Sequence, residues 1–240
     1  MSPPLPRTTL LRQFDTYRLL PSRFATHEDS VLTGIAEDDA HLADLFELDN
    51  ATNERLRGQR GLLAGIGVDE LVFGVPNAGL INAAFTYAHP QGSRFNGPDR
   101  GAWYCSFEEE TALSEVSFHK SIEYQEIGFF HDSVTYEALL ADFTNAFHDI
   151  RRDPRFKSCI DPASYNASQK LALRLMERGS VGLIYPSARR QRGTNLACFR
   201  PAVVANVRRG GTYRLTWSGE PAPKIEIVRR TTARAARGTL

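Results

Sequence analysis

Apolar and polar positions along the chain predict strands and helices that follow one another without strict alternation. Short apolar or aromatic runs between glycine, proline and polar turns predict strands at 14–20, 102–106, 181–185 and 196–199, with a late hairpin at 213–217 and 224–228. Amphipathic spacing predicts helices at 38–56, from 108 to about 122, and from Ser164 or Asn166 to Arg178. We therefore expect an α+β fold.

Three further segments complete the expected elements. The segment 136–150 has apolar residues at the spacing of the buried side of an amphipathic helix: Leu139, Leu140, Phe143 and Phe147. The segment 123–130 is predicted as a strand. The stretch 25–80 has many glycines and few groups that indicate chemistry, so we interpret it as a largely helical N-terminal insertion that covers or borders a site elsewhere.

Composition sets limits on the class of protein. The 240 residues are 42% hydrophobic, which is enough for the core of a single domain, and the formal net charge of +1 argues against a dedicated nucleic-acid binder. The arginines near the end of the chain are interpreted as part of a loose basic tail over 229–240. Three cysteines without CxxC spacing favour a reducing compartment, and no apolar run is long enough for a membrane span. We expect a soluble cytoplasmic protein that contacts neither membrane nor nucleic acid.

The stretch 92–119 combines polar groups with unusual backbone requirements. A loop between Gly92 and Gly97 contains Arg94, whose guanidinium fits phosphate oxygens, and a short aromatic strand and a helix follow it. Helical periodicity places Glu115 on the same side as Phe118 and other residues that favour burial. A buried carboxylate is costly without a partner, so Glu115 is either a structural ion pair or a group that orients a ligand hydroxyl or stabilises a developing cation.

Other polar positions could complete such a site. His119 is either a satisfied core residue or a ligand-binding one. The segment 185–195 offers Ser187, Asn195, and either Arg189 or Arg190 for an anion, although it could also be an ordinary polar turn. The helix N-terminus near 165–169, with Ser168, could hold phosphate or sugar oxygens.

Several chemistries find no support in the sequence. There is no Walker A loop, GxGxxG, GxSxG or HExxH motif, and the six histidines lack metal-ligand spacing, so we predict no metal site. An enzyme without a metal or an obvious nucleophile would work by positioning and charge stabilisation. Arginine, tyrosine and a single glutamate suit cleavage of an N-glycosidic bond through an oxocarbenium-like transition state.

At this point the residues resemble a known family, the RES-domain toxins, which are named for an arginine, a glutamate and a serine. The resemblance runs in order from about Tyr17 to about Phe199 and rests on these blocks: Arg94-Phe95-Asn96-Gly97, Trp103-Tyr104, Thr111-Ala112-Leu113-Ser114-Glu115, Gly182-Leu183-Ile184-Tyr185-Pro186-Ser187-Ala188-Arg189, and Asn195. It implies a single RES-type domain over 1–240, with a mixed sheet flanked by helices as in ADP-ribosyltransferases. The long stretch between Arg18 and Arg94 is absent from compact members of the family.

The resemblance also implies an activity and the residues responsible. NAD would be the substrate of a toxin that cleaves its nicotinamide–ribose bond by phosphorolysis or hydrolysis; an alternative is ADP-ribose transfer to a protein. Glu115, Arg94 and Ser187 would be catalytic, with Tyr104 stacking on the nicotinamide end. The other residues implied in NAD binding are Arg18, His119, Ser168 and Asn195, and the family serine is either Ser168 or Ser187.

The resemblance implies a partner as well, a cognate antitoxin that carries a DNA-binding domain and blocks the cleft. Inorganic phosphate or a protein could accept the ADP-ribose. A rival interpretation from a different class is a non-catalytic module that docks a partner through its basic tail, but a docking surface gives no reason to bury Glu115.

Overall fold

The computed structural model describes residues 4–25, 62–63 and 65–230. Within these residues, a seven-stranded mixed sheet runs in the order β1-β4-β7-β6-β5-β8-β9. Its strands are β1 (Thr8–Pro21), β4 (Trp103–Ser106), β5 (His131–Asp149), β6 (Gly182–Pro186), β7 (Thr194–Cys198), β8 (Ala205–Ser218) and β9 (Lys224–Arg229). A small hairpin consists of β2 (Leu62–Leu63) and β3 (Ile66–Gly67). The expected α+β class is confirmed.

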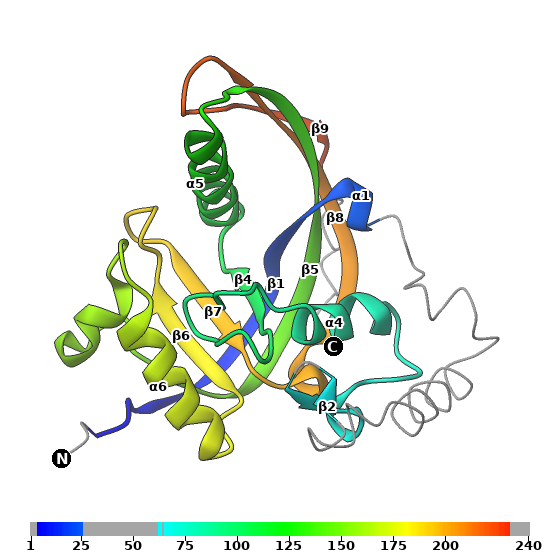
Figure 1. Cartoon of the computed structure of the whole chain (residues 1–240). Coiled ribbons are helices and arrows are strands. Elements are labelled where there is room, and N and C mark those ends of the chain that lie inside the picture. Colours follow the sequence, from blue (N-terminus) through cyan, green and yellow to red (C-terminus); the bar gives the residue numbers. More distant parts are fainter. Residues whose placement is uncertain (1–3, 26–61, 64, 231–240) are drawn as a thin grey trace, which may run out of the picture.

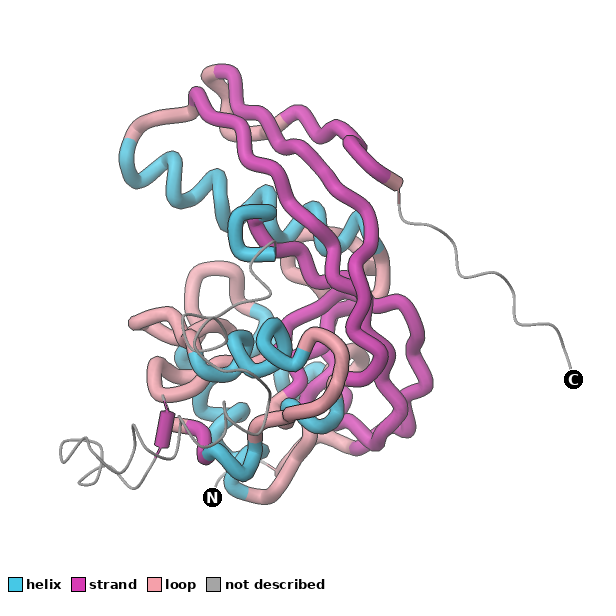
Figure 2. The backbone as a smooth tube through the Cα atoms, turned by 90° about the vertical axis from the view of Figure 1, so that its right-hand side faces the viewer, coloured by secondary structure: helices cyan, strands magenta, loops and turns pink. Residues whose placement is uncertain are grey.

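Helices gather mainly on one side of the strands (Figure 2). The α-helices among the described residues are α1 (Ser22–Ala25), α4 (Ala78–Thr86), α5 (Glu109–Ile127) and α6 (Asn166–Glu177). Short 3₁₀ helices occur at η1 (Val68–Glu70), η2 (Pro154–Ile160) and η3 (Pro201–Val203). None of the helices in this part of the chain is long and apolar enough to cross a membrane.

The sheet curls so that β1 meets two strands that are far apart in the sheet order. β1 pairs with β4 at Tyr17 and Ser106, and it also pairs with β5 from Thr8 to Pro21. β4 pairs with β7, β7 with β6, and β6 with β5. Together with β1, these strands therefore form a closed ring. The long strands β5 and β8 continue beyond the ring as a curved ribbon beside α5 (Figure 1).

The segment 136–150 is a strand, so the prediction of an amphipathic helix is wrong. Every residue from Tyr136 to Phe143 is buried. Both faces of β5 are covered here, because Leu139, Ala141 and Phe143 belong to one core cluster and Tyr136 and Ala138 to another. A strand buried on both faces shows no period-two alternation. The bulges in its pairing, near Leu139 and Asp142, further disturb the pattern, so the apolar spacing resembled that of a helix.

The strand predicted at 123–130 is also wrong, because α5 continues to Ile127 and ends at Gly128 in the left-handed conformation. The strands near 102–106, 181–185 and 196–199, the late hairpin and the helix ending near Arg178 are confirmed. The strand predicted at 14–20 is confirmed but starts earlier, at Thr8. The helix predicted at 38–56 lies outside the described residues.

The described part of the stretch 25–80 packs into the main core. Ile66, Leu71 and Leu80 belong to the same buried cluster as Trp103, Phe143 and other residues of the sheet. At the other end of the chain, Arg229 is not part of a loose tail, because it lies in β9 and its guanidinium donates to Glu137 Oε1 at 2.7 Å.

Candidate functional site

The site forms beside the first half of α5, where β4 and β6 end and β7 begins. β4 leads directly into α5, and Ser106 at its end is paired with Asn195 of β7. Asn195 is in turn paired with Tyr185 of β6, two residues before Ser187. The strand register therefore places Ser106, Asn195 and the turn with Ser187 at the same end of three neighbouring strands.

The start of α5 is held at this edge by its own N-terminal residues. Glu108 precedes the first turn, and its Oε2 accepts hydrogen bonds from Thr111 Oγ1 at 2.7 Å and from the Thr194 backbone N–H at 3.0 Å. Glu109 and Glu110 lie in the first turn, where carboxylates complement the positive end of the helix dipole. These contacts fix α5 against β7.

Glu115, the half-buried carboxylate of α5, receives two strong hydrogen bonds at one oxygen. Its Oε1 accepts from Ser187 Oγ at 2.6 Å and from Asn195 Nδ2 at 2.7 Å. Among the described residues, no hydrogen bond to its Oε2 is found. The carboxylate is therefore held in one orientation by one of its oxygens, which leaves the other for a ligand. Both donors are neutral, and no ion pair to Glu115 is found among residues 4–25, 62–63 and 65–230, so the structural ion pair that the sequence left as an alternative is not seen in this part of the chain.

The helical face that led to Glu115 is less apolar than expected. Ile122 is exposed and Phe118 is only half-buried. Glu115 is hydrogen-bonded by Ser187, from the turn after β6, and by Asn195 of β7. The apolar neighbours on its own helix contribute less to its burial than predicted.

Ser187 is placed at the centre of a tight polar turn. Its Oγ donates to Glu115 and accepts from the backbone N–H groups of Arg189 and Arg190, each at 3.0 Å. This uses the one proton and both lone pairs of the hydroxyl. Ser187 thus orients the carboxylate and stabilises the turn, and neither a histidine nor a lysine side chain among the described residues is hydrogen-bonded to its hydroxyl.

Asn195 is buried and connects Glu115 to a second buried hydroxyl. Its Oδ1 accepts from Ser106 Oγ at 2.7 Å, while its Nδ2 donates to Glu115. Ser106 was not selected as a site residue from the sequence. The only signal was its place at the end of the strand that contains Tyr104, because its partner is 89 residues away.

Ser168, the other candidate for the family serine, has a different environment. It is fully buried in the first turn of α6, and its Oγ donates to the Tyr165 carbonyl at 2.9 Å. No contact joins it to Glu115, Ser187 or Asn195 in the described part of the chain. Ser187 is therefore the serine that the structure brings to the carboxylate.

Arg94 is buried, and its guanidinium holds two parts of the chain together. Nη1 donates to the Asp161 carbonyl at 2.8 Å and to the Cys159 carbonyl at 3.2 Å, and the group lies 4.7 Å from the centre of the Tyr165 ring. Its loop is a tight turn in which Ser93 N–H donates to the Asn96 carbonyl at 2.9 Å. Gly92 has a positive φ in this turn, and a Cβ at this position would lie 2.3 Å from the Asn96 backbone oxygen, so the turn requires glycine.

Tyr104 ties the same turn to the sheet. Its hydroxyl donates to Asn96 Oδ1 at 2.7 Å and accepts from the Phe95 N–H at 2.8 Å. Burial raises its pKa well above the usual value, so the phenol stays protonated at neutral pH. Its ring is half-buried, and its hydroxyl already has partners in the protein.

Arg18 lies close to this strand despite the long stretch that separates them in sequence. Its Nη1 donates to the Tyr104 carbonyl at 3.2 Å, and its guanidinium lies 5.0 Å from the centre of the Trp103 ring. Its Nε is buried without a hydrogen-bond partner among the described residues. Burial lowers the pKa of Arg18 to about 10, so it remains charged at neutral pH. The pairing of β1 with β4 thus brings Arg18 next to the strand that leads to the site.

His119 and Arg189 lie on the outer side of Glu115. The Arg189 guanidinium stacks on the Phe118 ring, 3.3 Å from its centre, and its Nη2 donates to the Pro162 carbonyl at 3.2 Å. Burial lowers the pKa of Arg189, the Glu115 carboxylate raises it, and the Arg94 charge lowers it further. His119 is exposed as a residue and lies edge to face against Phe118. Desolvation of its ring lowers its pKa, the Glu115 carboxylate raises it, and the charges of Arg189 and Arg94 lower it further.

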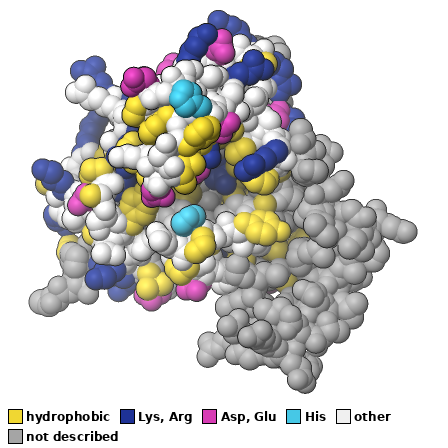
Figure 3. All heavy atoms as spheres, turned by 45° about the horizontal axis from the view of Figure 1, so that its top comes forward, with side chains coloured by type: hydrophobic (Ala, Val, Ile, Leu, Met, Phe, Trp, Pro, Cys, Tyr) yellow, Lys and Arg dark blue, Asp and Glu magenta, His cyan; other side chains and the backbone are white. Residues whose placement is uncertain are grey.

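Figure 3 shows the molecule with the top of Figure 1 turned toward the viewer. On this face, basic, acidic and histidine side chains lie among hydrophobic ones.

The charges of Arg94, Arg189 and Glu115 all act on His119, which places these groups in one electrostatic neighbourhood. No group of three or more possible metal ligands occurs among residues 4–25, 62–63 and 65–230. The arrangement supplies one fixed carboxylate, neutral hydrogen-bond donors and several guanidinium groups, a set suited to a substrate that is anionic and develops positive charge.

Residues 71–218 of the sequence match the model of a protein family described as RES domain. The chain belongs to the RES-domain family. The match includes the proposed site residues of α5, of the 92–97 loop and of β6 and β7, whereas Arg18 precedes it. The family expected from the sequence motifs is thus confirmed.

No match was found among curated proteins. A similar solved structure is a chain of the M. tuberculosis MbcT–MbcA toxin–antitoxin complex, at 13% sequence identity and a TM-score of 0.47, with 88% of this chain and 87% of the other covered.

Proposed function

We propose that this RES-domain protein is the toxin of a toxin–antitoxin system and that it cleaves the nicotinamide–ribose bond of NAD. The observation that carries the proposal is the Glu115 carboxylate, held at Oε1 by Ser187 and Asn195 beside Arg94 and Arg189. The resemblance of its motifs to the RES-domain toxins supplies the substrate. NAD matches the site because it combines an anionic pyrophosphate with a ribose that becomes cationic as the bond to nicotinamide breaks.

In this proposal, Glu115 stabilises the oxocarbenium-like ribose through the oxygen that has no protein partner. A fixed carboxylate is effective because it needs no reorganisation as the positive charge develops. Ser187 and Asn195 keep it in place. Nicotinamide leaves as a neutral molecule, and the electrons of the broken C–N bond remain on its ring nitrogen, so the leaving group needs no proton.

Guanidinium groups would bind the pyrophosphate. Arg94 keeps part of its fork occupied by backbone carbonyls, whereas Arg18 has a buried Nε without a partner among the described residues and Arg189 is held by stacking on Phe118. Tyr104 supplies a half-buried ring for the nicotinamide end, His119 lies at the rim, and Ser168 supports the start of α6.

The central test is release of nicotinamide by the purified protein. The wild type incubated with NAD is expected to release nicotinamide, measured by liquid chromatography. Glu115→Gln, which removes the charge and keeps the shape, is expected to lower kcat by about 10²–10³-fold, the usual range for loss of one electrostatic stabiliser. Glu126→Gln is the matched control, because Glu126 is an exposed glutamate of the same helix. Equal rates for the two variants would remove Glu115 from the mechanism.

The acceptor of the ADP-ribose is found in the same assay. Phosphorolysis requires inorganic phosphate and yields ADP-ribose 1-phosphate, whereas hydrolysis proceeds without phosphate and yields ADP-ribose. Transfer of radiolabel from NAD to a protein band would instead identify a protein ADP-ribosyltransferase. Absence of nicotinamide release under all three conditions, together with unaffected growth on expression, would favour the non-catalytic module.

We further propose that a cognate antitoxin with a DNA-binding domain covers this site. The support is the resemblance to RES-domain toxins and the cluster of polar side chains around Glu115 beside α5. Co-expression with the product of a neighbouring gene is expected to restore growth, and the purified complex is expected to release nicotinamide more slowly than the free chain. A complex that retains the full rate would show that the partner binds elsewhere.

A further inference from the structure

Ser106 is not among the residues proposed to contact NAD, but the side chain of Asn195 connects its buried hydroxyl to Glu115. Ser106 lies at the end of β4, is 4% exposed, and has Oγ 2.7 Å from Asn195 Oδ1. Asn195 is 3% exposed and donates from Nδ2 to Glu115 at 2.7 Å. The three residues form a continuous line of hydrogen bonds from the sheet interior to the carboxylate.

The direction of every bond in this line is determined by the carboxylate. An ionised carboxylate only accepts hydrogen bonds, so the amide of Asn195 must turn its NH₂ group toward Glu115. Its carbonyl oxygen then faces Ser106, which must donate. Without the Ser106 hydroxyl, the Asn195 carbonyl would be buried without this partner, and the amide would lose the contact that favours one orientation over its flipped alternative.

We propose that Ser106 is a positioning residue for the reaction, acting through Asn195 to hold Glu115 in its productive orientation. Ser187 supplies the second donor to the same oxygen, but it lies on a turn after β6, whereas Ser106 and Asn195 lie on paired strands inside the sheet. The sheet register thus sets the angle of the carboxylate. This inference rests on the proposed NAD cleavage for its effect on rate, and on the hydrogen-bond line alone for its structural part.

The test is a double-mutant cycle with Ser106→Ala and Asn195→Ala. Alone, Ser106→Ala is expected to lower kcat by about five- to tenfold with KM nearly unchanged, because one hydrogen bond that orients a transition-state group is lost. In the Asn195→Ala background, the same change is expected to alter kcat by about twofold or less, since its route to Glu115 is already broken. Ser106→Thr, which keeps a hydroxyl, is expected to have a higher kcat than the alanine variant.

Ser180→Ala provides the matched control. Ser180 is also a buried serine with hydrogen bonds, to His148 Nδ1 at 2.9 Å and to the Gly182 carbonyl at 3.2 Å, and no contact connects it to Glu115 in the described part of the protein. Its variant is expected to lose stability and keep kcat. Additive effects of Ser106→Ala and Asn195→Ala, or equal effects of Ser106→Ala and Ser180→Ala on kcat, would overturn the proposal.

A second measurement decides the inference if the wild type releases no nicotinamide. The side-chain NH₂ signals of Asn195, assigned by their loss in Asn195→Ala, are expected at low field in ¹H–¹⁵N spectra because one proton is bound to a carboxylate. They are expected to move in Ser106→Ala and to stay in place in Ser180→Ala. Unchanged signals in Ser106→Ala would overturn the positioning role, whereas absent nicotinamide release with shifted signals would overturn only the proposed reaction. If the alanine variant does not fold, the nearly isosteric Ser106→Cys replaces it in both measurements.

Discussion

Among single residues, the sequence picks out candidate side chains but does not show which contacts hold them. Glu115 was identified by its position on a helix, but its partners Ser187 and Asn195 are 72 and 80 residues away. Arg94 was selected for its glycine-bracketed loop, yet its contacts to the Cys159 and Asp161 carbonyls were not foreseeable. Such contacts depend on the fold of distant segments, which local pattern does not contain.

The hydroxyl of Tyr104 makes contacts of this kind, and its contribution to stability can be tested apart from that of the ring. Tyr104→Phe keeps the ring and removes the hydrogen bonds to Asn96 and Phe95, which leaves a backbone N–H in the turn without its partner. We expect the free energy of unfolding to fall by about 1–3 kcal/mol, the usual cost of an unsatisfied buried group. Urea unfolding measures this. Tyr87→Phe is the control, since Tyr87 is 77% exposed and should change stability by less than about 0.5 kcal/mol.

At the scale of elements, short elements bounded by clear turns were predicted well, and long curved strands were not. The ends of α6 and the β8–β9 hairpin follow from local signals, because glycine and proline mark their boundaries. β5 was mistaken for a helix because burial on both faces removes the alternation by which strands are recognised. α5 is longer than predicted, because the segment after Ile122 was assigned to a strand, whereas Glu123, Gln125 and Glu126 are exposed on a helix that continues to Ile127.

The far end of α5 is held to the β8–β9 ribbon through Trp217. Its Nε1 donates to Ser121 Oγ at 3.0 Å and to the Pro221 carbonyl at 3.2 Å, and its ring meets Tyr124 edge to face at 4.9 Å. Trp217→Phe removes the donor and part of the buried ring, so we expect a loss of about 2–4 kcal/mol in urea unfolding. Val228→Ala, at an exposed position of β9, is expected to stay within about 0.5 kcal/mol of the wild type. Equal midpoints for the two variants would contradict this anchoring role.

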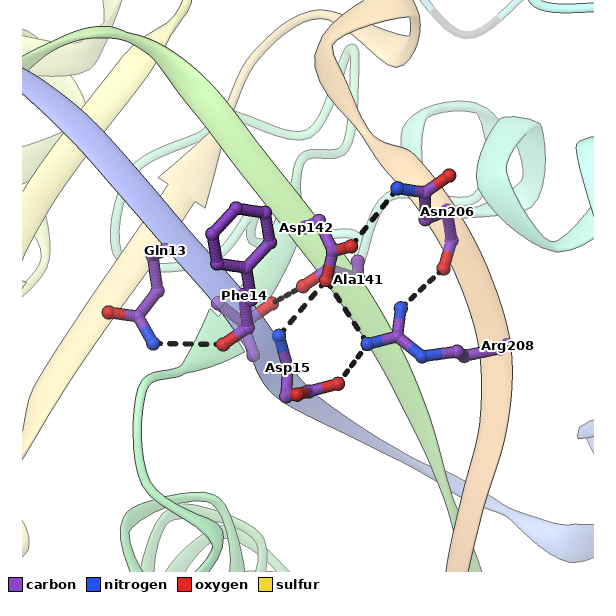
Figure 4. A network of polar contacts seen from close by, with 8 residues as sticks. Gln13, Phe14, Asp15, Ala141, Asp142, Asn206 and Arg208 are labelled. Carbon is purple, nitrogen blue, oxygen red and sulfur yellow. Dashed lines mark hydrogen bonds and ion pairs between the residues drawn. The ribbon is translucent and has the colours of Figure 1, made fainter. Parts of the chain in front are cut away.

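At the scale of the whole molecule, the ring of strands depends on pairings that no sequence pattern reveals. β1 pairs with β5 from Thr8↔His148 to Pro21↔Tyr136, far apart in the sequence, and near its bulge a polar network joins three strands (Figure 4). Asp142 of β5 accepts from the Asp15 backbone N–H of β1 at 3.0 Å, and from Asn206 and Arg208 of β8 at 3.0 and 3.1 Å. Arg208 also pairs with the Asp15 carboxylate. This network closes the sheet where β1 bends.

The same network predicts how stability depends on pH. Burial raises the pKa of the Asp142 carboxyl, but the hydrogen bonds from Asp15, Asn206 and Arg208 together outweigh it, so the pKa in the folded state lies below the ordinary value. A carboxyl with a depressed pKa binds protons more readily in the unfolded chain. Its contribution is therefore present above the unfolded pKa of about 3.9 and is lost as the pH falls through the lower pKa of the folded state.

Asp142→Asn isolates this contribution, because it removes the charge and keeps the size of the side chain. We expect the variant to be less stable than the wild type by about 1.5–3 kcal/mol at neutral pH, the range for hydrogen bonds to a charged group. The difference should remain constant down to about pH 5 and shrink below about pH 4, as the wild-type carboxyl becomes protonated. Urea unfolding at a series of pH values measures both, with Glu126→Gln expected to match the wild type throughout. A difference that does not vary with pH would mean that Asp142 stabilises the junction of β1, β5 and β8 by packing and neutral hydrogen bonds, and not by its charge.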